Sequence, residues 1–432
     1  MKKLEIKNVK GTNDYGNEEQ IIRNYISDTL RKTFEKYGYK PLSTSLLCYY
    51  DLLALKYDEE NDILKEIYKV TDQANRSLAL RYDLTVPFAK YISLNQNINM
   101  PYKRYEIGTV FRDGPVKQGR VREFIQCDVD CVGIDGQMVE AELIALYVDG
   151  YKSLDIDITI KYNNRKIMSG IIEVCNIPKD KIADTITIID KFEKLSKEEI
   201  RNEFLKIGLE EEQITDLIRY LNMDFASIVK TFEGTQNINL QEGIKEITEL
   251  NKYIKYLEVE EYVTFTLTLA RGQEYYTGTV FEVYQKNGKI KSSIGGGGRY
   301  DKIIGDFIGD GKRYPAVGIS FGLDVIFEIL KERGSIKNTN TDVYIIPMGN
   351  TLEGLEIAQN LRSRGINVDI EMNNKKVKKA LNYANVENIP YVIIIGEDEL
   401  KKRKVILKDM KTGEQKEVEI EKIIERIGEL YD

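Results

Sequence analysis

The sequence predicts an α+β region over residues 1–330, built around an antiparallel sheet, and a smaller α/β domain with a mixed sheet over residues 342–432. Three observations support this fold class. Alternating apolar and polar residues on either side of a turn-rich loop predict a long antiparallel hairpin within residues 104–132. Residues 165–255 are rich in Glu, Lys and Ile at helical spacing, which indicates a helical insertion. After residue 341, strands alternate with helices of about a dozen residues, as in βαβ units.

The first elements follow from periodicity and from the signals that end helices. Residues 17–37 carry apolar side chains at helical spacing and stop at Gly38, so they predict a helix. Short strands, a second helix and the hairpin are expected after it. In order, these are strand 40–49, strands or hairpin arms 60–70 and 76–82, helix 83–92, and hairpin strands 104–112 and 122–132.

The remaining elements surround the insertion and fill the second domain. Those of the larger region are helix 138–152, strands 155–162, 262–270, 277–285, 295–298 and 315–321, and helix 322–333. Residues 331–341 are the best linker candidate because they contain glycine and small polar residues. The second domain is expected to contain strands 342–347, 366–371, 390–395, 403–408 and 416–420, helices 352–364 and 375–386, and a final helix.

The most restrictive fact in the composition is that none of the 432 residues is histidine. This excludes Ser-His-Asp and Cys-His catalysis and every zinc site with His ligands. The cysteines, Cys48, Cys127, Cys131 and Cys175, fit no common metal signature, so we expect buried, reduced thiols and no metal site. The net charge of -7 argues against a surface that coats nucleic acid broadly, and DNA is not an expected partner.

The chain shows no sequence signal for export or membrane insertion. Its N-terminal residues include lysines but no apolar stretch, and no run of eighteen apolar residues occurs. We therefore expect neither a signal peptide nor a membrane span, and a cytoplasmic location.

Three segments contain residues suited to ligand binding, and each also has an ordinary structural explanation. Residues 295–298, all glycine, form either a tight turn or a floor where a ligand approaches the backbone. Residues 271–278 place an arginine beside two tyrosines at a strand junction, where a surface turn is equally compatible. The hairpin loop 113–120 has arginines on both sides and is either a solvated turn or a phosphate-binding loop, because Arg binds phosphate in planar, bidentate geometry.

Together these segments resemble the class II aminoacyl-tRNA synthetases, and in detail the histidyl-tRNA synthetase family. The resemblance covers nearly the whole chain, and Ala-Arg-Gly-x-x-Tyr-Tyr is its most specific part. It implies a six-stranded antiparallel class II sheet and a C-terminal anticodon-binding domain. The matching segments are Lys10-Gly-Thr-Asn-Asp-Tyr15, Leu80-Arg-Tyr-Asp-Leu-Thr-Val-Pro87, Arg104-Tyr-Glu-Ile-Gly-Thr-Val-Phe-Arg112, Arg122-Glu-Phe-Ile-Gln-Cys-Asp-Val-Asp130, Ala270-Arg-Gly-Gln-Glu-Tyr-Tyr276, Gly296-Gly-Gly-Arg-Tyr-Asp301 and Ala316-Val-Gly-Ile-Ser-Phe-Gly-Leu-Asp324.

The resemblance implies that ATP activates histidine to histidyl-adenylate, which then esterifies the 3′ end of tRNA(His). The implied catalytic residues are Arg112 and Arg271, acting on the α-phosphate from opposite sides. Histidine would be bound by Asp83, Thr85, Gln126, Asp130, Tyr275, Tyr276 and Tyr300. ATP would be bound by Arg112, Arg120, Phe124, Arg271, Gly296, Gly297 and Gly298, and tRNA by Lys117, Gln118 and Arg120.

The family further implies a homodimer, and Mg²⁺ that accompanies ATP without a dedicated protein site readable from the sequence. Lysine-rich stretches at 375–379 and 401–408 are candidates for contact with tRNA, and a solvated surface is their alternative. Two departures from the family pattern concern the nucleotide: Val325 replaces an arginine that usually contacts it, and Gly114 replaces a carboxylate near adenine. Thr44-Ser45 replaces Thr-Pro in the first motif, and Gln273-Glu274 replaces Leu-Asp in the signature.

Two other functions stay open at this point. Val325 and Gly114 favour a related regulatory subunit of ATP phosphoribosyltransferase that senses histidine, whereas Arg112, Arg271 and a complete C-terminal domain favour the enzyme. A non-catalytic sensor of uncharged tRNA is the second alternative. Histidine-dependent ATP–pyrophosphate exchange separates the enzyme from both.

The missing histidines also bear on pH dependence, because the only imidazole in the implied reaction is the substrate's. A pocket lined by tyrosines is expected to prefer the neutral ring, since burying an imidazolium without a dedicated carboxylate is costly. We therefore expect the acid limb of kcat/KM for histidine to follow the ring pKa, ~6.5, and a triazole analogue to lose that limb.

Overall fold

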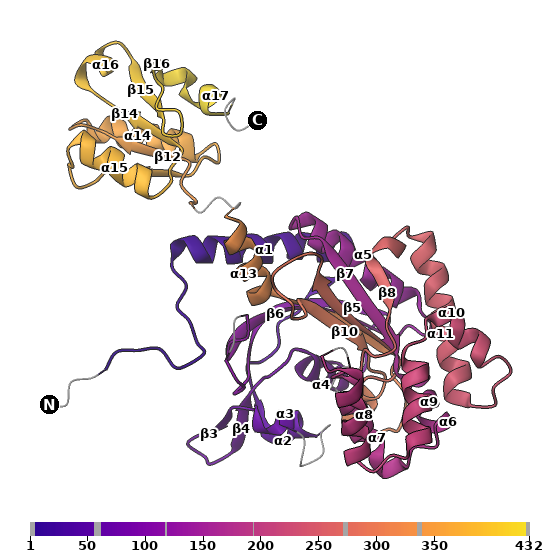
Figure 1. The fold of residues 1–432 in the computed structure, drawn as a ribbon. Coiled ribbons are helices and arrows are strands. Elements are labelled where there is room, and N and C mark those ends of the chain that lie inside the picture. The colour runs from indigo at the N-terminus through magenta and orange to yellow at the C-terminus, as the bar shows by residue number, and fades with distance from the viewer. Residues whose placement is uncertain are drawn as a thin grey trace. The chain divides into compact units, whose positions relative to one another are not determined.

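The computed structural model describes residues 5–55, 62–116, 119–192, 194–270, 275–334 and 339–428. The chain divides into two compact units: the smaller consists of residues 15–24 and those from 333 onward, and the larger of the other residues up to 332. The larger unit contains two sheets and the smaller unit one (Figure 1). Over the described ranges, no helix is both long enough and apolar enough to cross a membrane.

The larger unit is built on an eight-stranded sheet with the order β1-β5-β6-β11-β10-β9-β7-β8. Its six central strands pair antiparallel, as expected. Two short edge strands pair parallel, β1 with β5 and β8 with β7, so the predicted count of six strands is too low. Edge strands of two and three residues are too short to produce a recognisable alternation. The strands are β1 (Lys40–Pro41), β5 (Tyr102–Phe111), β6 (Glu123–Val132), β7 (Ile158–Asn164), β8 (Val263–Phe265), β9 (Thr279–Gln285), β10 (Gly295–Arg299) and β11 (Ala316–Gly322).

Helices α1 (Asn17–Lys36) and α5 (Met138–Ser153) pack on one face of this sheet. The ring of Phe321 on β11 lies 5.6 Å from that of Phe34 on α1 and 4.8 Å from that of Tyr147 on α5, measured between centroids. Helices α4 (Thr85–Leu94) and α12 (Ile303–Ile308) pack against each other and share a core with Tyr276 and Tyr300. Helix α13 (Leu323–Arg333) follows β11 directly.

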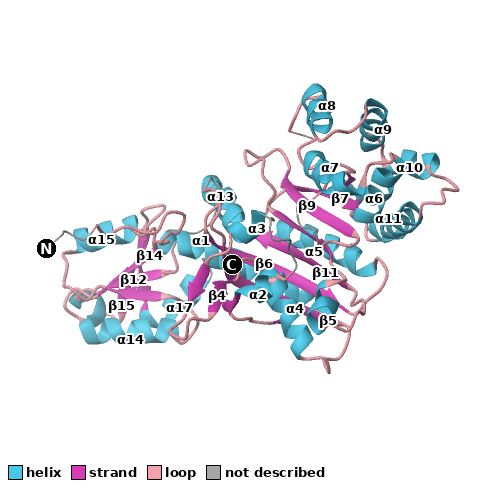
Figure 2. Ribbon diagram, turned by 90° about the horizontal axis from the view of Figure 1, so that it is seen from below, coloured by secondary structure: helices cyan, strands magenta, loops and turns pink. Residues whose placement is uncertain are grey.

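The helical insertion leaves the sheet after β7 and returns through β8, which pairs with β7. Its helices therefore start and end at the same edge of the sheet, and Figures 1 and 2 show them grouped there. They are α6 (Arg165–Val174), α7 (Ile182–Ile189), α8 (Lys197–Lys206), α9 (Glu211–Leu221), α10 (Phe225–Thr231) and α11 (Ile238–Tyr256).

A small second sheet lies in a region where two of the predicted strands are wrong. The predicted strand 40–49 is wrong as a single element, because β1 ends at Pro41, and Thr44 is hydrogen-bonded to buried Glu106. The predicted strand 60–70 is helical at its described start and extended only at its end. The sheet has the order β2-β4-β3. Its elements are β2 (Leu47–Tyr49), α2 (Tyr50–Ala54), α3 (Asp62–Lys65), β3 (Lys69–Thr71) and β4 (Ser77–Leu80).

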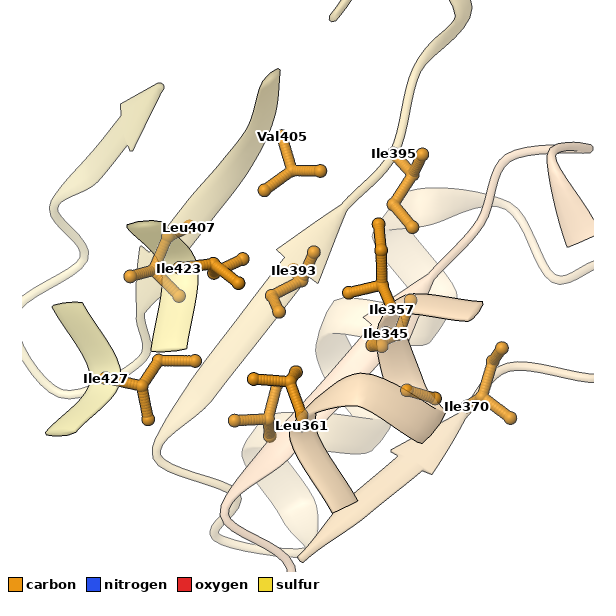
Figure 3. Packing of buried hydrophobic residues seen from close by; sticks show 12 residues of the cluster. Ile345, Ile357, Leu361, Ile370, Ile393, Ile395, Val405, Leu407, Ile423 and Ile427 are labelled. Carbon is orange, nitrogen blue, oxygen red and sulfur yellow. The ribbon is translucent and has the colours of Figure 1, made fainter. Parts of the chain in front are cut away.

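The smaller unit is a five-stranded mixed sheet with the order β13-β12-β14-β15-β16, covered on both faces. Apolar side chains of α14 and α17 meet one face: Ile357 and Leu361 of α14 share a core with Ile345 and Ile393 of the sheet (Figure 3). Ala380 and other residues of α15 meet the opposite face. The elements are β12 (Val343–Ile346), α14 (Thr351–Arg362), β13 (Val368–Ile370), α15 (Val377–Val386), β14 (Tyr391–Ile394), α16 (Glu397–Lys401), β15 (Lys404–Asp409), β16 (Gln415–Glu419) and α17 (Ile423–Gly428).

Candidate active site

A cavity of about 840 Å³ is lined by residues of β6, β10 and β11 in the main sheet. Along β6, Gln126, Asp128 and Asp130 line the cavity, whereas the intervening Cys127 and Val129 are fully buried. This alternation follows from the two-residue period of a strand, which turns successive side chains to opposite faces. The polar face of β6 therefore belongs to the cavity.

Most residues that the sequence singled out line this one cavity, although they come from distant segments. They are Asp83, Thr85, Arg112, Arg120, Phe124, Gln126, Asp130, Tyr275, Tyr276, Gly296, Gly297 and Tyr300. Arg271, Lys117 and Gln118 lie outside the described residues. Gly298 is described but does not line the cavity. A Cβ at Gly298 would stand 2.8 Å from the Tyr276 ring, so the absence of a side chain makes room for that ring.

Asp83 and Thr85 reach the cavity from the start of α4. Oδ1 of Asp83 accepts a hydrogen bond from the Val86 backbone N–H at 3.0 Å, in the first turn of this helix. The bond satisfies one of the backbone donors that a helix start leaves without a partner. Asp83 therefore stabilises α4 and presents a carboxyl group to the cavity at the same time.

Arg112 and Phe124 form a second part of the cavity, near the loop that joins β5 and β6. Arg112 donates its Nε–H to the carbonyl of Tyr82 at 3.0 Å, which fixes the direction of its guanidinium. The guanidinium carbon lies 5.2 Å from the centre of the Phe124 ring, within the range of a cation–π interaction. An aromatic face and a fixed guanidinium side by side suit a ligand with a flat ring and a phosphate.

Charged side chains form a buried cluster at the base of the cavity. Arg104 is fully buried, and its Nη2 lies 2.7 Å from Oδ2 of Asp130 while its Nη1 lies 3.5 Å from Oε2 of Glu106. Tyr300 donates its hydroxyl to Oδ1 of Asp130 at 2.5 Å. Residue 318 has to be glycine for this arrangement, because a Cβ on Gly318 would stand 1.9 Å from Oδ1 of Asp130.

Burial dominates the acid–base behaviour of this cluster. It raises the pKa of Asp128 to about 8, with the Arg104 guanidinium opposing the rise and the Asp130 carboxylate adding to it. Burial also raises the pKa of Asp130, although Arg104 and the hydrogen bond from Tyr300 act in the opposite direction. The pKa of Tyr300 is raised by its burial, so its hydroxyl stays a neutral donor. The raised pKa of Asp128 therefore favours its protonated form while no cation lies beside it.

Three tyrosines complete the cavity wall beside this cluster. The ring centres of Tyr275 and Tyr276 are 4.6 Å apart, and Tyr275 meets Tyr300 edge to face at 6.2 Å. Phenol groups donate or accept hydrogen bonds without bringing a charge. This wall therefore suits a neutral heterocycle better than a cation.

Several residues that line the cavity were not predicted to have a functional role. Asp128 was part of a matching segment but was given no role, although its place two residues from Asp130 on a strand puts both on one face. Asp324 accepts a hydrogen bond from the Ile125 backbone N–H at 2.8 Å, which ties α13 to β6. Lys161, Lys194 and Lys291 also line the cavity, and no local motif marks them.

The two positions whose departure from the family pattern concerns the nucleotide both line the cavity. A carboxylate does lie beside Gly114: a Cβ there would stand 2.9 Å from Oε1 of Glu66. Glu66 also accepts a hydrogen bond from Arg120 at 3.1 Å. A Cβ on Gly119 would lie 3.5 Å from the Val325 side chain, so the backbone of the hairpin loop passes close to this position.

The antiparallel sheet and the cavity on its polar face define a class II aminoacyl-tRNA synthetase. The family model described as "Histidyl-tRNA synthetase" matches residues 11–326, and the one described as "Anticodon binding domain" matches residues 342–430. "Histidine--tRNA ligase 1" of Bacillus cereus is 50% identical over 96% of this chain and 95% of its own length. The chain belongs to the histidyl-tRNA synthetase family.

Solved structures share the fold over nearly the whole chain. Histidyl-tRNA synthetase from a Nostoc species superposes with a TM-score of 0.88 at 29% identity, covering 99% of this chain and all of that one. A Bacillus halodurans protein described as an ATP phosphoribosyltransferase regulatory subunit/histidyl-tRNA synthetase superposes with a TM-score of 0.76 at 21% identity, covering 91% of this chain and 99% of its own. The second match shows a shared fold.

Proposed function

We propose that this histidine–tRNA ligase activates histidine with ATP in the described cavity and transfers it there to the 3′ end of tRNA(His). One observation carries the proposal. A buried carboxyl cluster, a wall of tyrosines, and a guanidinium beside an aromatic ring line the same cavity. These surfaces suit, in turn, an ammonium group, a neutral imidazole and an adenosine phosphate.

The amino acid would bind with its α-ammonium group toward Asp83, Gln126 and Asp130. Its imidazole would contact Tyr275, Tyr276 and Tyr300, with Thr85 at the same end of the cavity. Carboxylates are the appropriate partners for a cation, and phenols for an uncharged ring.

ATP would bind with its adenine against Phe124 and its α-phosphate near Arg112, over the backbone of Gly296 and Gly297. Attack of the histidine carboxylate on that phosphate brings two anions together, and positive charge on both sides offsets their repulsion. We assign this role to Arg112 and Arg271, and we assign Arg120 to ATP and the tRNA acceptor end. No protein base is required for the transfer step, because the phosphate of the adenylate accepts the ribose proton.

Synthetases of this kind use ATP with a divalent metal. Over the described ranges, no group of three or more His, Cys, Asp or Glu side chains is arranged to hold a metal ion. We therefore expect Mg²⁺ to arrive on the phosphates of ATP, and no step above depends on a metal bound by the protein. Because charged tRNA is used at the ribosome, we place the enzyme in the cytoplasm.

We also propose that two copies of the chain associate through the small sheet. Leu46, Leu47 and Tyr49, at and before β2, are 46%, 48% and 58% exposed, and β2 is an edge strand. Exposed apolar side chains on a sheet edge favour association with another chain. Sedimentation analysis is expected to give the mass of a dimer, and Leu47→Glu is expected to shift the equilibrium toward monomer. A monomeric wild-type protein at micromolar concentration would contradict the proposal.

ATP–pyrophosphate exchange tests the activation step. Purified full-length protein is expected to exchange labelled pyrophosphate into ATP with histidine and with no other standard amino acid. The regulatory-subunit and tRNA-sensor alternatives predict binding of histidine or tRNA without exchange. Absence of exchange in a protein that binds histidine would therefore overturn the proposed function.

A further inference from the structure

Asp128 is a buried carboxyl group of the cavity that the proposed activation of histidine does not use. Asp128 is 4% exposed, and its Oδ1 has no hydrogen-bond partner within the described part of the chain. Oε1 of Gln126, on the same face of β6, also lacks a hydrogen-bond partner there, and Oδ2 of Asp130 is in an ion pair of 2.7 Å with Arg104. Two acceptors without donors beside a third, ion-paired carboxylate oxygen indicate a ligand that brings several N–H groups to one point.

The surrounding charges leave Asp128 as the uncompensated carboxyl group of the cluster. Arg81 neutralises Glu106 at 2.7 Å, and Arg104 neutralises Asp130 at 2.7 Å. No cationic side chain among the described residues forms an ion pair with Asp128. The groups that act on it are Arg104 of β5, Asp130 of its own strand, Asp83 before α4, Ser320 of β11 and Tyr300 after β10. Glu106 lies opposite Asp128 in the register of β5 and β6.

We propose that Asp128 binds the α-ammonium group of the substrate together with Gln126 and Asp130, and that the amino acid displaces a proton from Asp128 as it binds. The inference rests on the proposed function. The ammonium group keeps its three N–H bonds and donates one to each of the three acceptors. The carboxyl O–H bond of Asp128 breaks, its electron pair stays on the carboxylate, and the proton passes to solvent.

The proton exchange gives histidine binding a pH dependence that resides on the protein. Burial raises the pKa of Asp128 to about 8 without ligand, and an ammonium beside the carboxylate lowers it. Affinity is then expected to rise about tenfold per pH unit between about pH 6 and 7.5. This changes the expectation drawn from the composition: a triazole analogue keeps an acid limb, because Asp128 titrates in addition to the substrate ring.

The matched variant is Asp128→Asn, which is expected to fold because the carboxyl group it replaces is already neutral at pH 7. Native Asp128 holds its proton up to about pH 8, whereas the unfolded side chain loses it near ~3.9. Unfolding of the wild type therefore releases a proton, and its ligand-free stability falls as pH rises from 5 to 8. Asp128→Asn has no carboxyl group at this position, so its stability lacks this contribution to the pH dependence. Its thermal midpoint is therefore expected to exceed that of the wild type by more at pH 8 than at pH 5.

Calorimetric titration with the triazole analogue of histidine counts the displaced protons. Full-length wild-type protein at pH 7, titrated in buffers of different ionisation enthalpy, is expected to release most of one proton per ligand bound, because burial raises the pKa of Asp128 to about 8. Asp128→Asn is expected to release fewer than ~0.2 and to bind with an affinity that is flat between pH 6 and 7.5. Asp324→Asn changes another carboxyl group of the same cavity and is expected to keep the wild-type proton count.

Two results would overturn the inference: equal proton release by the wild type and Asp128→Asn, or a wild-type affinity for the analogue that does not change with pH. The second measurement needs no variant and stands even if Asp128→Asn fails to fold. Failure of the wild type to bind either histidine or the analogue would instead contradict the proposed function on which the inference rests.

Discussion

Arg271→Gln is expected to slow formation of histidyl-adenylate by at least ~10², with a much smaller change in histidine affinity. A guanidinium on the α-phosphate interacts most strongly when charge accumulates in the transition state, so its loss acts on the rate more than on binding. Arg112→Gln is expected to have an effect of the same order. The hydrogen bond from Arg112 to the Tyr82 carbonyl holds this guanidinium beside Phe124 before any ligand arrives.

Pre-steady-state measurement of adenylate formation, with histidine affinity measured separately, checks this expectation. Arg201→Gln is the matched control, because Arg201 is an exposed residue of α8 that pairs with Glu211 on the surface. Exposed ion pairs contribute little to stability, so this variant is expected to keep the wild-type rate. If Arg271→Gln lost affinity and rate in equal proportion, the residue would hold the substrate without stabilising the transition state.

Deletion of residues 341–432 is expected to reduce tRNA charging by at least ~10² in kcat/KM while histidine activation changes little. Contacts with the far end of the tRNA supply binding energy that the catalytic region uses only when tRNA is the substrate. The deletion removes a domain with its own core on both faces of its sheet. Two core clusters of the larger unit, around Phe88 and around Leu53, consist of described residues that all precede residue 341.

A milder variant separates loss of contact from loss of folding in this experiment. Lys376, Lys378 and Lys379 are exposed at the start of α15, and their replacement by glutamine leaves the domain core intact. We expect weaker charging and a smaller dependence on salt concentration, because fewer phosphates are neutralised. A parallel loss of activation and charging in a folded truncation would show that the two units do not divide the work as proposed.

Periodicity in the sequence predicted the β5–β6 hairpin and helix α1 accurately. The hairpin strands alternate over ten residues each, and α1 repeats its apolar positions over several turns, so both were predicted to within two residues of their observed bounds. Strand β8 was predicted over 262–270 but ends at Phe265, and a two-residue strand such as β1 has no period to detect. The ends of such short edge strands are determined by pairing with the neighbouring strand and not by the local sequence.

The site was predictable to the extent that its residues lie in recognisable segments. The motifs named Asp130 and Tyr300 but gave no sign that Arg104 and Gly318 determine how they are held. Asp128 looked like one more polar residue of an alternating strand. Its importance depends on charges from other strands and on its burial, which arise only when the sheet forms.

The most direct test of the central claim is the charging of tRNA(His) by the purified full-length protein with labelled histidine and ATP. The account predicts that histidine becomes attached to the 3′ end of tRNA(His), that attachment requires ATP, and that tRNAs for other amino acids stay uncharged. Binding of tRNA(His) and histidine with no ester formed, at any pH between 6 and 8.5, would contradict it.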